Sequence, residues 1–589
     1  AAAAGQLFVS AENAMFNNYF AGAQVVEIIV KDPNRILTAE SQSEPTVKVN
    51  EFPIRMAQGV DGYWYAYIVE SNEVAAADAN ANLDFGSSTE AFTTVTFNSN
   101  IVSYHPDATA NIVGQAPSLS NWNSVTNLAD VDAGQIGVDT DEWPFIQALD
   151  FTLETIEIKL EQAGTDEVVT LKHDNDDIDN YSSVALDRNA ASFDAEVHLT
   201  VTDQALNIDP TTEDIVMFKV DSDYGVSFKA TSTSSLADYA AFSNGFDDNG
   251  KLKINYNTNG ADNAVLINES TADDFYADVY LVFYETAENS GIFVNTDDDD
   301  DSSLNVNTSA LGARGTTATI DYADSAQSFA IAHDFATIDM DAASVGDEWN
   351  SGEEMTIVLY DQDLNLNTFK DEDLTVSGGT LVPSIQIGSP LTATSAGDGD
   401  ATSVSSFSKI ALYDNAVTAT TFTIDTGYDL TALVAIETDY TFFAYDFDSF
   451  GTVSSVTLQD GSANVLATTT DGQGIKVIAA AAVDTAVTAA AAGNLDVVVV
   501  IGTTSTQSSS PFTADIFSFD EATNNAIYRV ELEETGDNTG IFEGSAEYVM
   551  LNQINAFVVG TYSAVNPTQD DVDMIVHLDM TDEDSIRVN

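Results

Sequence analysis

One loop of this chain carries side chains that could bind a metal ion. It reads Asp-Gln-Asp-Leu-Asn and places Asp361, Asp363 and Asn365 at alternate positions, with Asp371 and Asp373 a few residues later. Alternating carboxylate and amide oxygens on a tight loop can converge on one hard cation, which takes about six to eight oxygens. The loop therefore predicts a bound Ca²⁺ ion, or alternatively Mg²⁺, and no organic cofactor is expected.

A second loop repeats the pattern with fewer ligands. Asp203, Asn207 and Asp209 are its candidate ligands, but Ala205 stands where the first loop has its second aspartate. Both loops also have a structural alternative, because Asp and Asn side chains often accept hydrogen bonds from the backbone of their own turn. Neither loop has the spacing of an EF-hand, which requires a glycine at its sixth position and a glutamate at its twelfth.

Three denser acidic runs are interpreted as solvated loops. They are Asp174–Asp179, Asp297–Asp301 and Asp570–Asp573. Neighbouring carboxylates repel each other and gather counter-ions, so such runs usually face water and do not form a specific cage.

No catalytic signature stands out in the sequence. It contains no Gly-x-Ser-x-Gly elbow, no His-Glu-x-x-His zinc motif, no phosphate-binding loop and no dinucleotide fingerprint. Carboxylate pairs of the kind that hydrolyse glycosides are uninformative here, since 95 acidic residues offer many chance pairs. We therefore expect the protein not to be an enzyme, and no catalytic residue is predicted.

Negative charge dominates the composition. Only 17 Lys and Arg oppose 95 Asp and Glu, for a formal net charge of −78, yet 44% of the residues are hydrophobic. That apolar content is too high for a disordered acidic chain, so the charge must lie on folded domains. Such a surface repels nucleic acid and anionic lipid and attracts cations. Cysteine is absent, which excludes disulfides and thiolate metal sites.

Short apolar runs recur along the whole chain, separated by clusters of Asn, Asp, Gly and Ser. Many of them alternate apolar with polar residues, as strands with one buried face do. Two signatures occur twice, the Asp-Gln-x-Leu-Asn loop and a Gly-Ile-Phe loop in which Gly291 and Gly540 are expected to adopt positive φ. The pattern predicts an all-β chain of tandem immunoglobulin-like β-sandwiches with long acidic loops.

The spacing of the repeats suggests the domain boundaries. A β-sandwich is expected at 1–108, a linker or inserted loop region at 109–150, and sandwich modules at 151–325 and 326–560. Residues 561–589 match the opening strand of a further, truncated module, so we expect the native polypeptide to continue. The chain is not expected to contain a transmembrane segment, because its most apolar stretch carries two aspartates.

The repeated loops, together with the segment Ile36–Glu70, resemble the surface-layer (S-layer) proteins of ammonia-oxidising thaumarchaea. The acidity and the lack of cysteine also fit that family, and the likeness spans most of the chain. It implies tandem immunoglobulin-like sandwiches, assembly of identical copies into a porous lattice around the cell, dependence on cations, and a longer precursor. The chain departs from the pattern at Asp32, where it reads Lys-Asp-Pro-Asn.

Three functional hypotheses follow from these features. The first is a structural cell-surface protein that self-assembles into a strongly negative S-layer lattice and enriches cations such as ammonium near the cell. The second is a calcium-rigidified extracellular adhesin or filament subunit, and the third is a salt-adapted secreted hydrolase. Identical copies and cations are the expected partners, and nucleic acid is not. An exported protein could carry glycans at the sequons of Asn180, Asn268 and Asn307.

Overall fold

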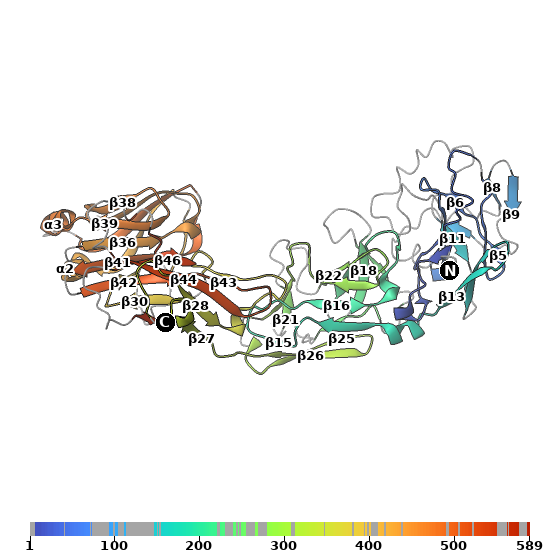
Figure 1. Cartoon of the computed structure of the whole chain (residues 1–589), viewed down its shortest axis with the longest axis horizontal. Coiled ribbons are helices and arrows are strands. Elements are labelled where there is room, and N and C mark those ends of the chain that lie inside the picture. Colours follow the sequence, from blue (N-terminus) through green and yellow to red (C-terminus); the bar gives the residue numbers. More distant parts are fainter. Residues whose placement is uncertain are drawn as a thin grey trace. The chain divides into compact units, whose positions relative to one another are not determined.

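The structure is a computed structural model of the whole chain, which divides into an amino-terminal unit, 1–333, and a carboxy-terminal unit, 334–589 (Figure 1). The residues that it describes are 6–40, 42–70, 72–73, 94–97, 100–103, 111–113, 146–149, 151, 155–220, 224–229, 239–242, 246, 249–254, 266–268, 280–307, 312–346, 348–379, 382–393, 395–396, 400–401, 410–417, 420–436, 440–489, 494–504, 507–520, 523–550, 562, 565–576 and 586–589.

The amino-terminal unit begins with a β-sandwich. Alternating strands such as β3, with the sequence VEIIV, turn every second side chain into a core that both sheets share. One sheet is built from β1 (Leu7–Val9), β3 (Val26–Val30), β6 (Ala57–Gln58), β7 (Trp64–Glu70), β10 (Asn111–Val113) and β11 (Ile146–Leu149). The other sheet is built from β2 (Tyr19–Phe20), β4 (Thr46–Val49), β5 (Phe52–Pro53), β12 (Ile156–Glu161) and β13 (Glu167–His173).

A second β-sandwich follows within the same unit. Its two sheets meet where Phe218 packs edge-on against Tyr322, with 5.7 Å between the ring centroids. The larger sheet has the order β14 (Ser183–Leu186), β16 (Leu199–Thr202), β23 (Ile292–Val294), β22 (Tyr280–Glu285), β17 (Ile215–Lys219), β18 (Gly225–Lys229) and β19 (Tyr239–Phe242). The smaller sheet has β15 (Ala190–Ala191), β26 (Ser325–Ile331), β25 (Thr317–Tyr322) and β20 (Lys253–Ile254). The amino-terminal unit also contains two two-stranded sheets outside these four sheets. They are β8 (Thr94–Phe97) with β9 (Asn100–Ser103), and β21 (Leu266–Asn268) with β24 (Leu304–Val306).

The first sandwich extends beyond the boundary that the sequence predicted. Strands β12 and β13 fall in the predicted module 151–325, yet β12 pairs with β4 and β13 pairs with β2. Pairing between strands more than 100 residues apart leaves no local signal, so a boundary drawn from repeat spacing could not place them.

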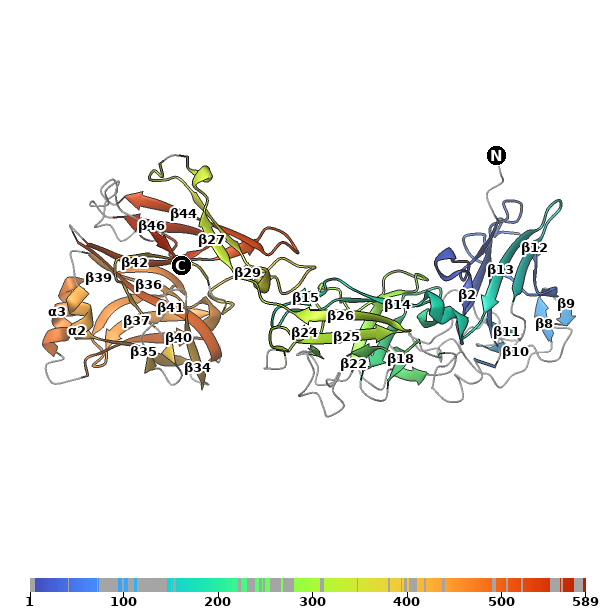
Figure 2. The same cartoon turned by 90° about the horizontal axis from the view of Figure 1, so that it is seen from below.

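The carboxy-terminal unit has three layers of sheet (Figure 2). The first contains β27 (Thr337–Met340), β28 (Met355–Tyr360), β44 (Ile541–Met550), β43 (Leu532–Glu534), β29 (Asp373–Leu374) and β46 (Asp571–Val576). The middle layer contains β39 (Gln473–Ile478), β36 (Tyr440–Asp446), β41 (Gln507–Asp520), β42 (Thr523–Val530), β30 (Ser384–Ile387), β47 (Arg587–Val588), β31 (Leu391–Thr392), β34 (Ala411–Val417) and β45 (Thr568–Gln569). The third contains β35 (Thr421–Asp429), β40 (Asp496–Thr503), β37 (Val453–Asp460) and β38 (Val465–Thr469).

A few short elements complete the described structure. The α-helices α2 (Leu430–Ile436) and α3 (Ala480–Ala489) lie side by side in the carboxy-terminal unit (Figure 1). The strands β32 (Ser395–Ala396) and β33 (Asp400–Ala401) form a small hairpin. The 3₁₀ turns are η1 (Ala14–Phe16), η3 (Asp177–Tyr181), η4 (Gln204–Leu206), η8 (Ala342–Ser344), η9 (Gln362–Leu364) and η10 (Asp448–Phe450). In the described part of the chain, no helix has the length and hydrophobicity that crossing a membrane requires.

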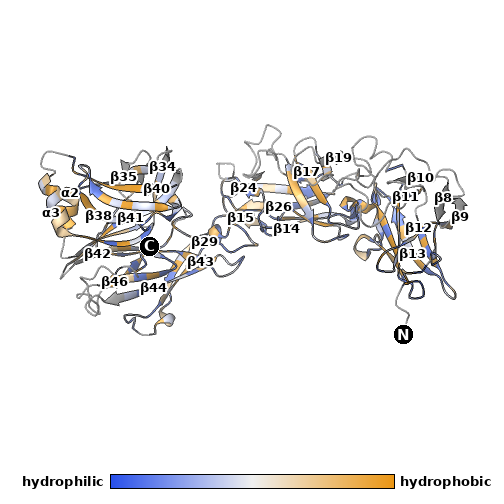
Figure 3. Ribbon diagram, turned by 90° about the horizontal axis from the view of Figure 1, so that it is seen from above, coloured by the Kyte–Doolittle hydropathy of each residue, from blue (hydrophilic) through white to orange (hydrophobic). Residues whose placement is uncertain are grey.

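The middle layer is buried on both faces. Along β36, Phe442 and Ala444 belong to one hydrophobic core, while Phe443 and Tyr445 belong to the other. A strand between two cores needs apolar side chains at successive positions, which explains the run Tyr-Thr-Phe-Phe-Ala-Tyr. Strands with one exposed face alternate instead: β12 reads Ile-Glu-Ile-Lys-Leu-Glu, its isoleucine and leucine side chains are buried, and it carries both hydrophobic and hydrophilic colours in Figure 3.

The last residues of the chain belong to these same sheets. Strand β46 runs parallel to β44, from Ser545 opposite Asp571 to Met550 opposite Val576, and Met574 is buried in the core. Strand β47 pairs with β30. Strands β46 and β47 therefore belong to the sheets of the carboxy-terminal unit, whereas the sequence predicted the opening strand of another module.

A buried ion pair lies within the middle layer. Arg529 and Asp515 are 1% and 3% exposed, and Nη2 of the arginine lies 3.3 Å from Oδ1 of the aspartate. Arg529 also donates hydrogen bonds to the hydroxyl groups of Ser384 and Thr392, both at 3.1 Å. Burial raises the pKa of Asp515 and lowers the pKa of Arg529, so loss of hydration outweighs the mutual attraction in each case.

Replacing Arg529 should strongly destabilise the middle layer. Arg529→Met leaves the Asp515 carboxylate buried without its cation, which should cost about 3–5 kcal/mol. The opening free energy of β41, measured by native-state hydrogen exchange, should fall by that amount, and adding Asp515→Leu should recover much of the loss. Lys476→Met is a matched control, because its partner Asp471 is largely exposed and such pairs contribute about 0–1 kcal/mol. Equal effects of the two single variants would contradict this account.

Candidate functional site

The two repeated signatures of the sequence occupy matching places in two sheets. In the amino-terminal unit the strand order is β14-β16-β23-β22-β17, and in the carboxy-terminal unit it is β27-β28-β44-β43-β29. The Asp-Gln-x-Leu-Asn loop follows β16 in the first and β28 in the second, while the Gly-Ile-Phe segment begins β23 and β44. Both units therefore contain the same five-strand arrangement, which agrees with the predicted internal repeat.

In the amino-terminal unit the two signatures bind each other, forming what we call the first clasp. The backbone N–H of Asp203 donates to the carbonyl oxygen of Gly291 at 2.8 Å. Nδ2 of Asn207 donates to Oδ1 of Asn289 at 2.7 Å. The loop after one strand is thereby tied to the loop before its neighbour.

The second clasp, in the carboxy-terminal unit, repeats these bonds. Asp361 N–H donates to the carbonyl oxygen of Gly540 at 2.9 Å, and Nδ2 of Asn365 donates to Oδ1 of Asn538 at 2.8 Å. The two halves of each clasp are 82 and 173 residues apart in sequence. Sequence reasoning found both signatures but not their contact.

The backbone conformation of each clasp favours glycine, and a glutamine side chain occupies the space beside it. Gly291 and Gly540 have φ of +64° and +58°, as the sequence predicted, in the region that favours glycine. A Cβ at Gly291 would lie 2.8 Å from the side chain of Gln204, and one at Gly540 would lie 2.2 Å from that of Gln362. The glutamine that both Asp-Gln-x-Leu-Asn loops share therefore packs against the glycine of the partner loop.

A buried glutamate closes each Gly-Ile-Phe loop. Oε1 of Glu285 accepts the backbone N–H groups of Ser290 and Gly291 at 2.7 and 2.8 Å. Oε1 of Glu534 accepts those of Thr539 and Gly540 at 2.7 and 2.6 Å. Sequence reasoning assigned no role to either glutamate, although both repeats have Glu-Thr five residues before the Ser-Gly or Thr-Gly step.

A second acid, immediately before the adjacent strand, holds the other loop. In the first clasp, Oδ2 of Asp214 accepts the N–H groups of Ile208 and Asp209 at 2.7 and 3.0 Å. Its own N–H donates to Oε2 of Glu285 at 3.1 Å, so the two acids are neighbours. This acid was also missed, because it lies within a longer run of charged and polar residues that resembles an ordinary loop.

Glu372 occupies the corresponding place in the second clasp. Its Oε1 accepts the N–H of Asn367 at 2.5 Å, and its own N–H donates to Oε2 of Glu534 at 3.4 Å. Each clasp therefore combines two loops with two adjacent acids.

Burial and hydrogen bonding shift the pKa values of the paired acids in each clasp. Burial, with a smaller contribution from the charge of Glu285, raises the pKa of Asp214 well above its ordinary value, and burial raises that of Glu285 to about 7. Burial and then a hydrogen bond with Glu534 raise the pKa of Glu372 to about 8. For Glu534, burial acts upward, but the hydrogen bonds from Glu372 and from backbone N–H groups outweigh it and lower the pKa. In the second clasp Glu372 therefore holds its proton more tightly than Glu534, which ionises first.

The predicted metal ligands Asp203 and Asp209, in the first clasp, accept hydrogen bonds from nearby protein groups. Asp203 is fully buried, and its Oδ1 accepts the N–H of Ala205 at 2.8 Å while its Oδ2 accepts the hydroxyl of Tyr322. Burial raises the pKa of Asp203 to about 6. Asp209 accepts the N–H and hydroxyl of Thr211. Both oxygens of Asp203 thus already accept hydrogen bonds from the protein, which favours the structural alternative.

The loop of the second clasp uses its oxygens in a similar way. Oδ1 of Asp361 accepts the N–H of Asp363 at 3.0 Å, and Oδ1 of Asp363 accepts the N–H of Asp334 at 3.0 Å. Asp371 is exposed, and Asp373 lies opposite Glu533 in the pairing of β29 with β43. Within the described ranges, no group of three or more acidic or histidine side chains is placed to hold a metal ion. Bound Ca²⁺ at the Asp361 loop stays a prediction.

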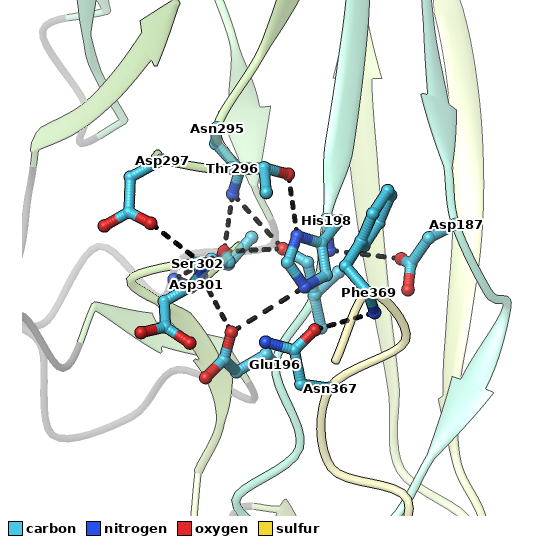
Figure 4. A network of polar contacts seen from close by, with 12 residues as sticks. Asp187, Glu196, His198, Asn295, Thr296, Asp297, Asp301, Ser302, Asn367 and Phe369 are labelled. Carbon is cyan, nitrogen blue, oxygen red and sulfur yellow. Dashed lines mark hydrogen bonds and ion pairs between the residues drawn. The ribbon is translucent and has the colours of Figure 1, made fainter. Parts of the chain in front are cut away.

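The acidic run Asp297–Asp301 forms its own turn. Oδ1 of Asp297 accepts the N–H groups of Asp299 and Asp301, both at 3.0 Å, and the run leads from β23 to β24 with its first four side chains exposed (Figure 4). Asp174 likewise accepts the N–H groups of Asp176 and Asp177. These two runs lie mostly at the surface, whereas part of Asp570–Asp573 enters β46.

A buried polar network lies at the base of the Asp297 turn. Asn295 donates to Ser302 Oγ at 2.8 Å and accepts the N–H of Leu199 at 2.7 Å (Figure 4). Nδ1 of His198 lies 2.8 Å from Oγ1 of Thr296, and its Nε2 lies 3.7 Å from Glu196. The contacts of Asn295 with Leu199 and of His198 with Thr296 tie the segment after β23 to the start of β16, so the network positions the turn.

Two of the three glycosylation sequons have described side chains. Asn180 is exposed and donates to the carbonyl oxygen of Asp177 at 3.0 Å, whereas Asn307 is only 7% exposed. The side chain of Asn268 lies outside the described residues. Of the two, Asn180 alone is accessible to a glycosylating enzyme in the folded chain.

Comparison with known proteins gives no family for this chain. No family model matches it, and no curated protein does. Among solved structures, the Escherichia coli adhesin FdeC aligns over 65% of this chain and 83% of its own, with 10% identity and a TM-score of 0.14. The Bacteroides ovatus protein SGBP-B, solved with a mixed-linkage heptasaccharide, aligns over 64% of this chain and 87% of its own, with 9% identity and a TM-score of 0.11. Similarity at this level carries no argument about function.

The proton on Glu372 makes the second clasp sensitive to pH. Because its pKa of about 8 in the folded chain exceeds the ordinary 4.5, the folded chain binds this proton more tightly than the unfolded chain. That stabilisation is complete below about pH 4.5 and is lost as the pH rises through about 8. Glu372 is only partly buried, so we expect the screened loss to be about 1–2 kcal/mol.

Hydrogen exchange of the Asn367 amide, which Glu372 accepts, measures this effect locally. Its opening free energy should decrease from about pH 5 to about pH 8 in the wild type, and much less in Glu372→Gln, whose side chain cannot ionise. Asp371→Asn, at the exposed neighbour, should retain the wild-type decrease. A decrease of the same size in Glu372→Gln would show that another group is responsible.

Proposed function

We propose that this chain is a structural cell-envelope protein whose copies self-assemble into a porous, strongly negative S-layer lattice at the cell surface. The observation that supports this most directly is the use made of the repeated polar residues. In both clasps, the glutamate of one signature accepts backbone N–H groups of its own loop, and asparagine side chains of the two signatures join the two loops. The repeated residues therefore fix loops at the ends of strands, which suits a structural role.

The all-β architecture supports the same proposal. Sandwiches and layered sheets expose few backbone groups and resist deformation, because main-chain hydrogen bonds cross every strand. The carboxy-terminal unit joins three layers through a middle sheet that has a hydrophobic core on either side. Such units are suited to serve as rigid building blocks of an extended array.

Net charge sets the conditions for assembly. At −78 per chain, identical copies repel each other unless cations bridge them or the contacts bury little charge. We therefore propose that divalent cations such as Ca²⁺ are needed for assembly. A negative lattice would enrich ammonium and other cations within about 8–10 Å of its surface at ordinary ionic strength.

An extracellular adhesin or filament subunit is the second candidate. The same series of β-sandwiches would also suit a stiff rod that reaches outward. The two candidates differ in the geometry of assembly, because a lattice repeats in two dimensions and an isolated rod does not.

Electron microscopy of the purified full-length protein separates these functions. With about millimolar Ca²⁺ we expect ordered sheets, and after chelation we expect them to dissolve into single chains, because the bridging charge has been removed. Sheets restored by adding Ca²⁺ back would control for irreversible damage. Isolated rods in both conditions would contradict the lattice and favour the adhesin or filament.

A further inference from the structure

We propose that an apolar patch around Lys31 in one copy of the chain binds an acidic ladder on β44 and β46 of another copy. This contact rests on the proposed self-assembly and names one of the surfaces that would carry it. The Lys31 patch consists of Phe8, Lys31, Ile36, Leu37, Val60 and Tyr63. The acidic ladder consists of Glu354, Glu547, Asp571 and Asp573.

Aromatic rings hold the ammonium group of Lys31. Its Nζ lies 4.7 Å from the centre of the Phe8 ring and 4.8 Å from that of Tyr63. The backbone fixes this arrangement, since Phe8 lies opposite Ile29 in the pairing of β1 with β3, and Lys31 N–H donates to Gln6 at 2.8 Å. The cation is therefore positioned at the surface by contacts that leave its charge uncompensated.

Lys31 differs in this from four other cations of the same sandwich. Arg35 pairs with Asp32, Lys48 with Glu161, Arg55 with Glu44 and Lys159 with Glu51, at 2.6–3.2 Å. Within the described residues, no carboxylate lies within ion-pair distance of Lys31. A lysine without a carboxylate partner is unusual in a chain with 95 acidic residues. Lys31 therefore offers a place where a carboxylate of another copy can bind.

Exposed apolar side chains lie on the segments next to Tyr63 and Phe8, beside the exposed carboxylate of Asp61. Val60 stands fully exposed at the tip of a tight turn, and Leu37 and Ile36 are 56% and 47% exposed. The turn lies against Ile36, because a Cβ at Gly62 would be 2.6 Å from the Ile36 carbonyl oxygen. Phe8 adds a further ring that is 44% exposed. Apolar groups around one charge exclude water from a contact and strengthen its electrostatic attraction.

The acidic ladder has the complementary charge. In the parallel pairing of β44 with β46, Glu547 lies opposite Asp573 and Ser545 lies opposite Asp571. Ser545 Oγ lies 3.0 Å from Asp571 and 3.1 Å from Glu354, which brings the carboxylate of the residue just before β28 to the same face. Like charges directly opposite each other destabilise a sheet, and a cation from outside would relieve this. A hydrogen bond with Asp573 raises the pKa of Glu547, in keeping with such crowding.

The two surfaces differ, so the contact joins copies head to tail. A head-to-tail contact does not close on itself as a two-fold dimer does, and it can extend into an open array. It thus provides one direction of growth for the proposed lattice.

A charge swap in the full-length chain tests the contact. Lys31→Glu and Glu547→Lys should each raise the dissociation constant for self-association at least tenfold, measured by analytical ultracentrifugation, because each places like charges together. The double variant should restore association, because the pair is complementary again. Val60→Ser should weaken association without changing charge, and circular dichroism should show every variant folded.

Lys172→Glu is the matched control, since Nζ of Lys172 lies 4.5 Å from the Tyr19 ring centre, outside the patch. It should associate as the wild type does. Association of Lys31→Glu at wild-type strength, or no recovery in the double variant, would overturn this contact while leaving self-assembly standing. A wild-type chain that never associates, with or without Ca²⁺, would instead overturn the proposed function.

Discussion

Backbone N–H groups at the ends of strands need acceptors, and in this chain carboxylates supply many of them. A strand that ends in a buried loop leaves donors that neither a neighbouring strand nor water can satisfy, and each such donor costs about 1–3 kcal/mol. Glu285 and Glu534 each accept two of these donors with one oxygen. The clasps therefore satisfy backbone donors where strands of both units end, and they hold the adjoining loops in place.

This use of carboxylates has a cost that the protonation states reveal. A carboxylate that accepts N–H groups in a buried place loses its hydration, which favours the protonated form. Placing two acids side by side adds their mutual repulsion, and Glu372 and Glu534 resolve it by sharing a proton unequally. A chain so rich in Asp and Glu can thus place acids where other proteins use amides, because a neutral carboxyl group can donate as well as accept a hydrogen bond.

The sequence predicted the class of fold and the repeats, but not how the repeats are joined. Periodicity is a local property, so alternation in strands such as Val26–Val30 indicated β-structure directly. The contact between Asn207 and Asn289 depends on strand order, which no local pattern records. The same holds for β12 and β13, whose partners precede them by more than 100 residues. At Asp203, the residue types suggested metal ligation, and only the positions of Ala205 N–H and the Tyr322 hydroxyl distinguish a backbone cap from an ion site.

Acidic residues have one role inside the clasps and another at the surface. This division explains how one acidic composition serves both folding and assembly. Inside the clasps, acids are few, specifically bonded and partly protonated, so they stabilise the sheets without adding their full charge. At the surface, acids such as Asp298 and Asp299 are hydrated, and their repulsion acts between whole copies. Folding therefore depends on short-range bonds that salt screens weakly, whereas association depends on long-range repulsion that salt and divalent ions screen strongly. A change in ionic conditions can consequently control whether copies associate while each copy remains folded, which is the behaviour that a lattice assembled outside the cell requires.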